Sequence, residues 1–107
     1  MGTNELLPGT LDMLVLKALS RGANHGYAIA QHIHQVTSDA LKIGEGSLYP
    51  ALQRLLVGEL VTAEWGLSEN NRKARIYKIT VKGRKRLAEE RKSFDSIVGA
   101  IARVMEA

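Results

Sequence analysis

The order of the hydrophobic patterns constrains the fold of this chain most strongly. Apolar residues recur at the three- and four-residue spacing of a helix in four segments, and two further segments are rich in β-branched and aromatic residues. Three short helical segments come first, two strand segments with a polar loop between them follow, and a long helical segment ends the chain. Its 107 residues suit one domain with a modest core.

The first helical segment begins at Thr10 and ends before Arg21. A threonine hydroxyl can accept a free backbone N–H, which makes Thr10 the expected cap, and Asp12 suits the positive end of the helix dipole. Apolar residues cover more than one side of this helix, so we expect a partner chain to meet its second side. These residues are Leu11, Met13, Leu14, Val15, Leu16, Ala18 and Leu19.

A second helix is expected from residues 24–27 to Val36, with Ile29, Ile33 and Val36 on its inner side. Residues 42–46 contain two glycines and predict a turn. The third helix is expected over residues 47–57, capped by Ser47, with Pro50 in its first turn and Gly58 at its end. Its buried stripe consists of Leu48, Leu52, Leu55 and Leu56.

Residues 60–65 and 75–80 are predicted to be strands, and the polar loop 66–74 between them predicts a β-hairpin. Thr80 is expected to cap a last helix that reaches nearly to Ala107, about 25 residues or roughly 37 Å long. Apolar residues follow each other along it at a spacing of seven, which favours helix pairing between subunits. They are Leu87, Phe94 and Ile101, with Ile97, Val98, Val104 and Met105 beside them.

This order of elements predicts an α+β, mostly helical fold, a winged helix-turn-helix with one added C-terminal helix. We expect residues 1–81 to form the DNA-binding domain and residues 82–107 to form a dimerisation helix. Positive charge is concentrated in Arg72 to Lys92, where ten basic and two acidic residues give a net charge of +8 in a chain of net +4. Such asymmetry fits nucleic acid as a partner, although a solvated helix face gives the same pattern.

In a helix-turn-helix the second helix of the motif lies in the DNA major groove. Glutamine reads adenine, arginine reads guanine or holds a phosphate, and a helix N-terminus attracts phosphate oxygens. Ser47 is open to a second interpretation as a cap only, and Tyr49 to one as a packing residue only. Because leucines take the inner face, the outer face of the third helix is expected to present Ser47, Tyr49, Pro50, Gln53 and Arg54.

The hairpin loop is expected to be a wing that contacts the phosphate backbone or the minor groove. A soluble loop tip has a similar composition and stays an alternative. Lys42, in the turn before the third helix, is a further candidate phosphate contact, whereas Trp65 is expected to pack within the wing. The candidate wing contacts are Asn70, Asn71, Arg72, Lys73 and Arg75.

Several classes of protein do not fit the sequence. It has no run of 18 apolar residues that would cross a membrane, no visible secretion signal and no cysteine, so we expect a cytoplasmic protein. His32 and His34 point apart on a helix, and no acidic residue completes a metal site. The chain has neither a Ser-His-acid order nor a phosphate loop, so we expect no enzyme, cofactor or metal.

Four motifs in this order resemble the PadR-like transcriptional regulators across nearly the whole chain. They are residues 7–12, residues 25–29, residues 46–52 with Arg54 and Leu55, and residues 75–80 with Gly83. The single C-terminal helix is similar to the compact branch of that family, which lacks a multi-helix C-terminal domain.

The resemblance implies a homodimeric repressor of an inverted-repeat operator. Its final helices would pair across the two-fold axis and the first helix, through Leu11, would join them. Family members sense small aromatic or lipophilic compounds, some of them between the paired helices. Phe94, the one aromatic residue of the last helix, is the candidate contact for such an effector, and its spacing also fits a dimer core.

An alternative function is a protein-interaction module, in which the winged helix is a scaffold and the long helix docks a partner. A neutral wing would favour that function. The cationic wing of this chain favours double-stranded DNA.

Overall fold

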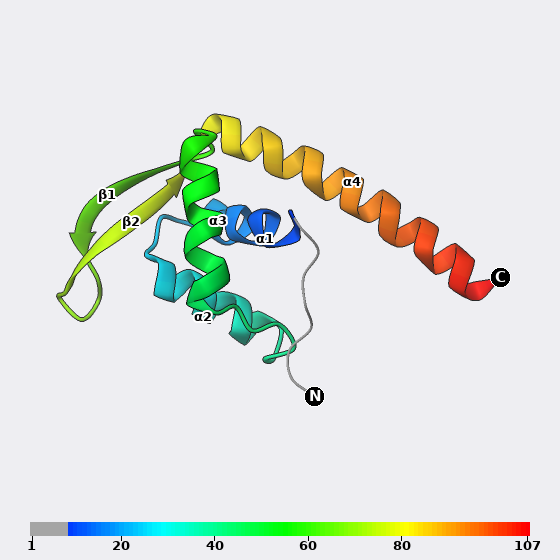
Figure 1. Ribbon diagram of the computed structural model, residues 1–107, viewed down its shortest axis with the longest axis horizontal. Coiled ribbons are helices and arrows are strands. Elements are labelled where there is room, and N and C mark those ends of the chain that lie inside the picture. The colour runs from blue at the N-terminus through cyan, green and yellow to red at the C-terminus, as the bar shows by residue number, and fades with distance from the viewer. Residues whose placement is uncertain (1–8) are drawn as a thin grey trace.

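The computed structural model describes residues 9–107, so Leu7 and Pro8 of the first motif lie outside the described residues. Three helices form the body, and a hairpin and a long helix extend away from it in different directions (Figure 1). The α+β, mostly helical winged helix-turn-helix fold is therefore confirmed. The elements are α1 (Thr10–Ser20), α2 (Gly26–Val36), α3 (Glu45–Val57), β1 (Val61–Leu67), β2 (Lys73–Ile79) and α4 (Val81–Glu106).

The hydrophobic core lies between α1, α2, α3 and the base of the hairpin. Burial of one such aliphatic side chain contributes about 1.5–3 kcal/mol to folding. Leu16 is fully buried, whereas Val36, expected on the inner side of α2, is 67% exposed because the last turn of α2 extends past the core. The most deeply buried side chains are Val15, Leu16, Leu19, Ile29, Leu48, Leu52, Leu55 and Val61.

Two helices begin differently from the sequence prediction. Gly9, at a φ of 87°, is the N-cap of α1, so Thr10 is its first residue and makes no capping hydrogen bond. Gly44 caps α3, because its carbonyl accepts the N–H groups of Ser47 and Leu48 at 3.1 and 2.9 Å. Ser47 is therefore not the cap of α3, and Pro50 lies in its second turn rather than its first.

The turn between α2 and α3 is held by a side chain of α2 and by its C-cap. The Nε2 atom of His34 accepts the N–H of Ile43 at 2.7 Å. The Thr37 hydroxyl donates to the Ile33 carbonyl at 2.8 Å and accepts the Leu41 N–H at 3.2 Å. These bonds fix the approach of the chain into α3.

The hairpin is longer than the sequence predicted. Its antiparallel register pairs Val61 with Ile79 and Leu67 with Lys73, so both strands have seven residues and the loop is reduced to residues 68–72. Lys73 and Arg75, expected in or next to the loop, therefore belong to β2, because the strands continue pairing toward the tip. Asn24 adds an isolated bridge to Tyr77, which attaches the chain before α2 to the outer edge of β2.

Thr80 caps α4 as expected, since its hydroxyl accepts the Gly83 N–H at 2.9 Å. The same hydroxyl donates to the Glu59 carbonyl at 2.9 Å, and the Thr80 N–H donates to the Leu60 carbonyl at 3.0 Å. Gly83 is buried at this crossing. A Cβ there would overlap the Leu60 carbonyl oxygen and lie 2.8 Å from Cγ1 of Ile79.

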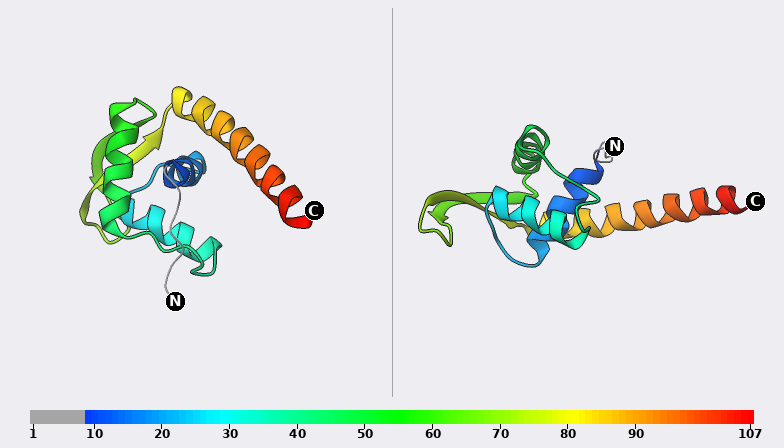
Figure 2. Two further views of the ribbon diagram at one scale, coloured as in Figure 1. Left: turned by 45° about the vertical axis from the view of Figure 1, so that its right-hand side comes forward. Right: turned by 90° about the horizontal axis from the view of Figure 1, so that it is seen from below.

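Only the first half of α4 packs on the body. Leu87 is half-buried against the core, and from Phe94 onward the large apolar side chains of α4 are exposed. Both further views show the C-terminal half of α4 extending clear of α1, α2 and α3 (Figure 2).

The two glycines of α4 should respond oppositely to alanine. Gly83→Ala should destabilise the fold by about 2–4 kcal/mol, because the added methyl group meets backbone that cannot move aside. Gly99→Ala, with its nearest neighbour Nη1 of Arg103 at 3.7 Å, should stabilise it by about 0.5–1 kcal/mol through helix propensity. Urea unfolding of both variants measures the difference, and equal stability of the two would contradict a close crossing at Gly83.

Candidate nucleic-acid interface

The outer face of α3 is exposed along its length. α3 lies at the front of the molecule in Figure 1, with the hairpin extending beside it. Leu48, Leu52 and Leu55 are buried as the leucine pattern required, whereas Leu56 of the predicted stripe is only partly buried. Ala51, which was not predicted in the stripe, is also buried. The outward side chains are Ser47, Tyr49, Pro50, Gln53 and Arg54, and Lys42 is exposed in the preceding turn.

Tyr49 combines packing with exposure. Its ring lies over Gly26 at the start of α2, where a Cβ would be 3.1 Å from the tyrosine hydroxyl, yet the residue is 46% exposed. Tyr27, in the first turn of α2, is also exposed, and it lines a cleft of about 200 Å³ together with Tyr49. Tyr27 was not among the residues predicted from the sequence, although its position off the Ile29 and Ile33 face was a usable signal.

Arg54 has a partner inside the chain. Its guanidinium donates to both carboxylate oxygens of Asp12, at 2.7 Å from one nitrogen and 3.3 Å from the other. This hydrogen-bonded pair raises the pKa of Arg54 above its ordinary value. The fork that would read guanine is therefore engaged with α1, and the base contact expected of Arg54 stays a prediction.

The cations of the wing surround a tryptophan. Trp65 of β1 is paired with Arg75 of β2 and packs against cations of the wing, although its side chain is 65% exposed. The Nζ of Lys73 lies 5.2 Å and the guanidinium carbon of Arg75 lies 5.9 Å from the centre of the indole ring. At such distances a cation is attracted to the ring face.

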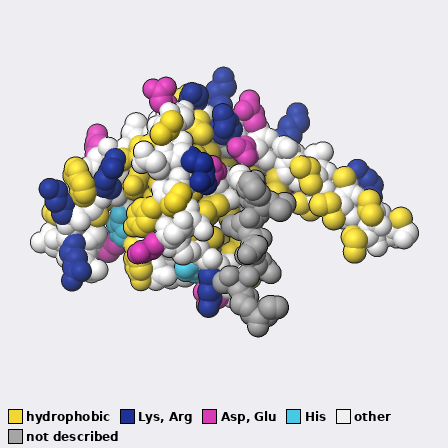
Figure 3. Space-filling model, in the orientation of Figure 1, with side chains coloured by type: hydrophobic (Ala, Val, Ile, Leu, Met, Phe, Trp, Pro, Cys, Tyr) yellow, Lys and Arg dark blue, Asp and Glu magenta, His cyan; other side chains and the backbone are white. Residues whose placement is uncertain are grey.

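Arg72 is exposed in the loop together with Asn70 and Asn71. Dark-blue cationic side chains gather over the hairpin, on the left of Figure 3. The surface they form comprises Trp65, Arg72, Lys73 and Arg75, and we call it the wing surface.

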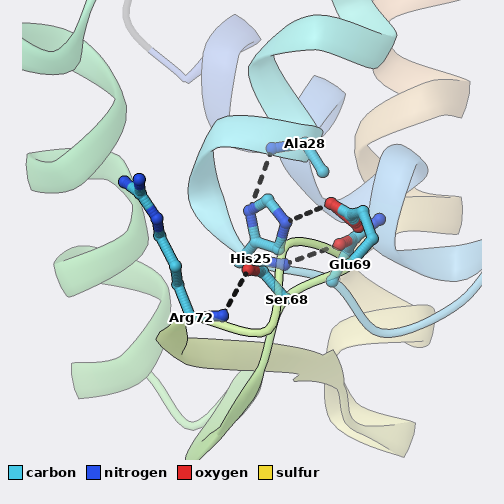
Figure 4. Close-up of polar contacts among 6 residues, drawn as sticks. His25, Ala28, Ser68, Glu69 and Arg72 are labelled. Atoms are coloured by element: carbon cyan, nitrogen blue, oxygen red, sulfur yellow. Dashed lines mark hydrogen bonds and ion pairs between the residues drawn. The ribbon is translucent and has the colours of Figure 1, made fainter.

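An acidic residue of the wing loop makes a contact that the sequence did not predict. Oε1 of Glu69 lies 2.9 Å from Nε2 of His25, the N-cap residue of α2 (Figure 4). This hydrogen bond lowers the pKa of the Glu69 carboxyl. The two residues are 44 positions apart, so no local pattern of the sequence could indicate the contact.

The apolar residues expected at a dimer interface divide into two groups. Leu11 is 8% exposed and belongs to the core of its own chain, and Leu87 packs against that core. Leu11 therefore offers little surface to a partner, because α1 is central to the body. The α4 stripe, 42–78% exposed, consists of Phe94, Ile97, Val98, Ile101, Val104 and Met105.

Two clefts flank α4. One of about 630 Å³ lies between α1 and α4 and is lined by Met13, Leu14 and Leu87 among others. The other, of about 290 Å³, follows the C-terminal half of α4 past Ile97 and Ile101. Phe94 lines both clefts.

Within residues 9–107, no three His, Asp or Glu side chains come close enough to hold a metal ion. No helix in that part of the chain is long and apolar enough to cross a bilayer.

An exposed helix after a tight turn, next to a cationic hairpin, defines a DNA-binding winged helix-turn-helix protein. The chain matches the model of the transcriptional regulator PadR-like family over residues 15–89. It therefore belongs to the PadR-like family, whose members are transcriptional regulators and not enzymes.

Two sequence relatives are described as uncharacterized proteins. One, protein X of Lysinibacillus sphaericus, is 30% identical over 106 residues, which are 99% of this chain and 97% of that protein. The other, a 37.1 kDa transposon protein of Streptomyces fradiae, is 42% identical over 89 residues. The match covers 83% of this chain but only 24% of the Streptomyces protein, so the chain spans about a quarter of that relative.

Solved structures agree with the family. A transcriptional regulator from Clostridium thermocellum superimposes with a TM-score of 0.81 at 26% identity, over 89% of this chain and 92% of its own. A PadR family regulator from Eggerthella lenta gives a TM-score of 0.77 at 27% identity, over 92% and 84%.

Trp65 is the single tryptophan of the chain, so its fluorescence reports on the wing surface alone. When each quenching constant is taken relative to that of a free tryptophan analogue with the same ion, iodide should quench Trp65 more efficiently than caesium, because Lys73 and Arg75 attract anions to the ring. High salt should remove this relative difference. Lys73→Gln should lower the iodide quenching constant. Lys78→Gln, on the opposite face of β2, should leave it unchanged. Equal relative quenching by both ions in the wild-type protein would contradict the cation arrangement.

Proposed function

We propose that this regulator is a homodimeric repressor that binds an inverted-repeat operator through α3 and the wing surface. One observation carries the proposal: the polar outer face of α3 is exposed, and the hairpin that holds the cations around Trp65 extends beside that helix (Figure 1). The α3 face has groups that read base edges, and the wing surface has groups that bind phosphates.

Tyr49 and Gln53 are the proposed groove contacts, since both are exposed on the outer face of α3. Lys42, in the turn before α3, and Ser47, in the first turn of α3, are proposed to contact phosphate. Pro50 is proposed to shape the approach of α3 to the groove. Arg54 reads a base or a phosphate only by exchanging its bond with Asp12. On the wing, Asn70, Asn71, Arg72, Lys73 and Arg75 are proposed to contact the DNA backbone or minor groove.

A second copy of this chain is the proposed partner of the α4 stripe. The stripe is apolar and exposed in the single chain, and its spacing suits knobs-into-holes packing. A two-fold dimer presents two α3 helices in opposite orientation, which matches an inverted repeat. This assignment divides the chain into a DNA-binding domain, residues 1–81, and a dimerisation helix, residues 82–107.

An aromatic or lipophilic effector is proposed to contact Phe94, which lines the clefts on both sides of α4. Because the same side chain lies on the stripe, a bound compound would compete with the partner helix. Release of DNA would follow from that competition.

Selection from a random-sequence duplex pool should enrich a two-fold symmetric site, and binding to it should weaken steeply with salt. Each neutralised phosphate contributes about −0.9 to the log-log slope, so Arg72→Ala with Lys73→Ala should flatten the slope by about one unit for every phosphate that is no longer neutralised. Tyr49→Ala or Gln53→Ala should instead reduce the preference for the selected site by roughly 1–3 kcal/mol.

The proposal fails if the combined Tyr49→Ala, Arg72→Ala and Lys73→Ala variant binds the selected duplex as tightly as the wild type. Absence of any enriched duplex would favour the alternative of a protein-interaction module.

Ile101→Glu should convert the dimer to a monomer, because it places a charge at the centre of the α4 stripe. Ser96→Glu, on the opposite side of the same helix, is the matched control and should stay dimeric. Sedimentation equilibrium distinguishes the two states. A dimer of unchanged affinity for Ile101→Glu would exclude this face as the interface.

A further inference from the structure

The wing loop contains an acidic residue at a place where DNA-binding proteins need positive charge. Glu69 lies between Ser68 and Asn70, and Arg72 follows in the same loop. A free carboxylate so close to the phosphate backbone would weaken binding by like-charge repulsion. The Glu69 carboxylate is not free, since it is bonded to His25 at the start of α2.

The hydrogen bonds of His25 fix the proton of its ring. Nδ1 accepts the Ala28 N–H at 3.3 Å and so caps α2, which requires that this nitrogen carry no proton. In the neutral ring the proton is then on Nε2, which donates to Glu69 Oε1 at 2.9 Å. The buried imidazole therefore joins the first turn of α2 to the wing loop with both of its nitrogens in use.

Hydrogen bonds within the wing loop close it, so a contact that fixes Glu69 fixes the position of the whole loop. The Ser68 N–H donates to the Arg72 carbonyl at 2.9 Å, the Asn71 N–H donates to the Ser68 carbonyl at 2.8 Å, and the Arg72 N–H donates to the Ser68 hydroxyl at 3.3 Å. Figure 4 shows Glu69 turned toward His25 and the Arg72 side chain extending on the other side of the loop. The His25 contact therefore holds the loop backbone from which the Arg72 side chain extends.

The other backbone contact between the hairpin and the start of α2 lies nearer the base of the strands. The Asn24–Tyr77 bridge is in the half of β2 nearer its base, several residues from the tip. Among residues 9–107, the tip without Glu69 would be held only through its own two strands, and a two-stranded ribbon is flexible.

We infer that His25 and Glu69 form a positioning pair that fixes the wing tip relative to α2 and α3, so that Glu69 promotes DNA binding despite its negative charge. This inference rests on the proposed DNA-binding function. The pair orders Arg72 and its neighbours before DNA arrives, which removes the cost of ordering them on binding.

The direction in which Glu69→Ala changes the affinity for DNA distinguishes a positioning role from simple charge repulsion. If Glu69 is only a surface acid, Glu69→Ala removes repulsion and tightens binding to the duplex selected by the wild-type protein. If it is a positioning residue, Glu69→Ala weakens that binding by about fivefold, the factor that corresponds to ~1 kcal/mol. Glu69→Gln keeps an oxygen that accepts from Nε2, so it should bind at least as tightly as the wild type.

Two further variants complete the test. His25→Asn keeps a side-chain oxygen that can cap α2 but is too short to reach Glu69, so it should weaken binding at least as much as Glu69→Ala, because the freed carboxylate then also repels phosphate. The double variant lacks that carboxylate and should lose no more than His25→Asn alone. Glu64→Ala removes an acid of the same hairpin that makes no ion pair within residues 9–107, and it should not weaken binding. Affinities are measured well below the melting temperature of every variant, which excludes unfolding as the cause.

The inference is overturned if Glu69→Ala binds as tightly as the wild type or more tightly, or if the His25→Asn and Glu69→Ala losses add. Failure of the wild-type protein to select any duplex is a different result, which contradicts the proposed function itself. A histidine side-chain NMR spectrum gives an independent readout. The Nε2 proton of His25 should be protected from exchange in the wild-type and Glu69→Gln proteins and exposed in Glu69→Ala.

Discussion

The burial of α1 at the centre of the molecule is the constraint on which the other elements depend. Val15, Leu16 and Leu19 are almost without exposed surface, and α2, α3, β2 and α4 all pack against this one helix. A helix that is apolar nearly all round is stable only when it is covered nearly all round. The positions of the recognition helix and of the long C-terminal helix are therefore set relative to a common rigid element.

Polar contacts then fix the orientations of helices that the apolar core defines only approximately. The Asp12–Arg54 pair joins α1 to the last turn of α3. His34 and Thr37 hold the turn that leads into α3. Pairs of this kind contribute little net stability at a surface, but they select one geometry among several of similar energy. A regulator that reads base edges requires such a selection, because hydrogen bonds to bases tolerate only small displacements.

The sequence was sufficient where local physics decides the structure. The helical spacing, the leucine stripe of α3 and the Thr80 cap all depend on residues a few positions apart, and each was predicted correctly. The start of α3 was predicted wrongly, because α3 begins after Gly44, whose carbonyl accepts the first backbone N–H groups, and not at Ser47. The partners of Arg54 and His25 are 42 and 44 positions away, and no single-sequence pattern contains that information. Trp65 packs within the wing, but the sequence pattern did not indicate that Lys73 and Arg75 lie over its exposed ring.

The crossing at Gly83 gives α4 the mechanical role of a lever. About 21 Å of helix separates Thr80 from Phe94 at the usual rise per residue, and the close approach of Gly83 to the Leu60 carbonyl leaves no slack at its pivot. A rotation of roughly ten degrees at such a pivot would displace Phe94 by about 3.7 Å, close to the roughly 3.4 Å of one base step along DNA. In the proposed dimer, the Gly83 crossing and the packing of Leu87 on the core together set how precisely two copies measure the spacing of two half-sites.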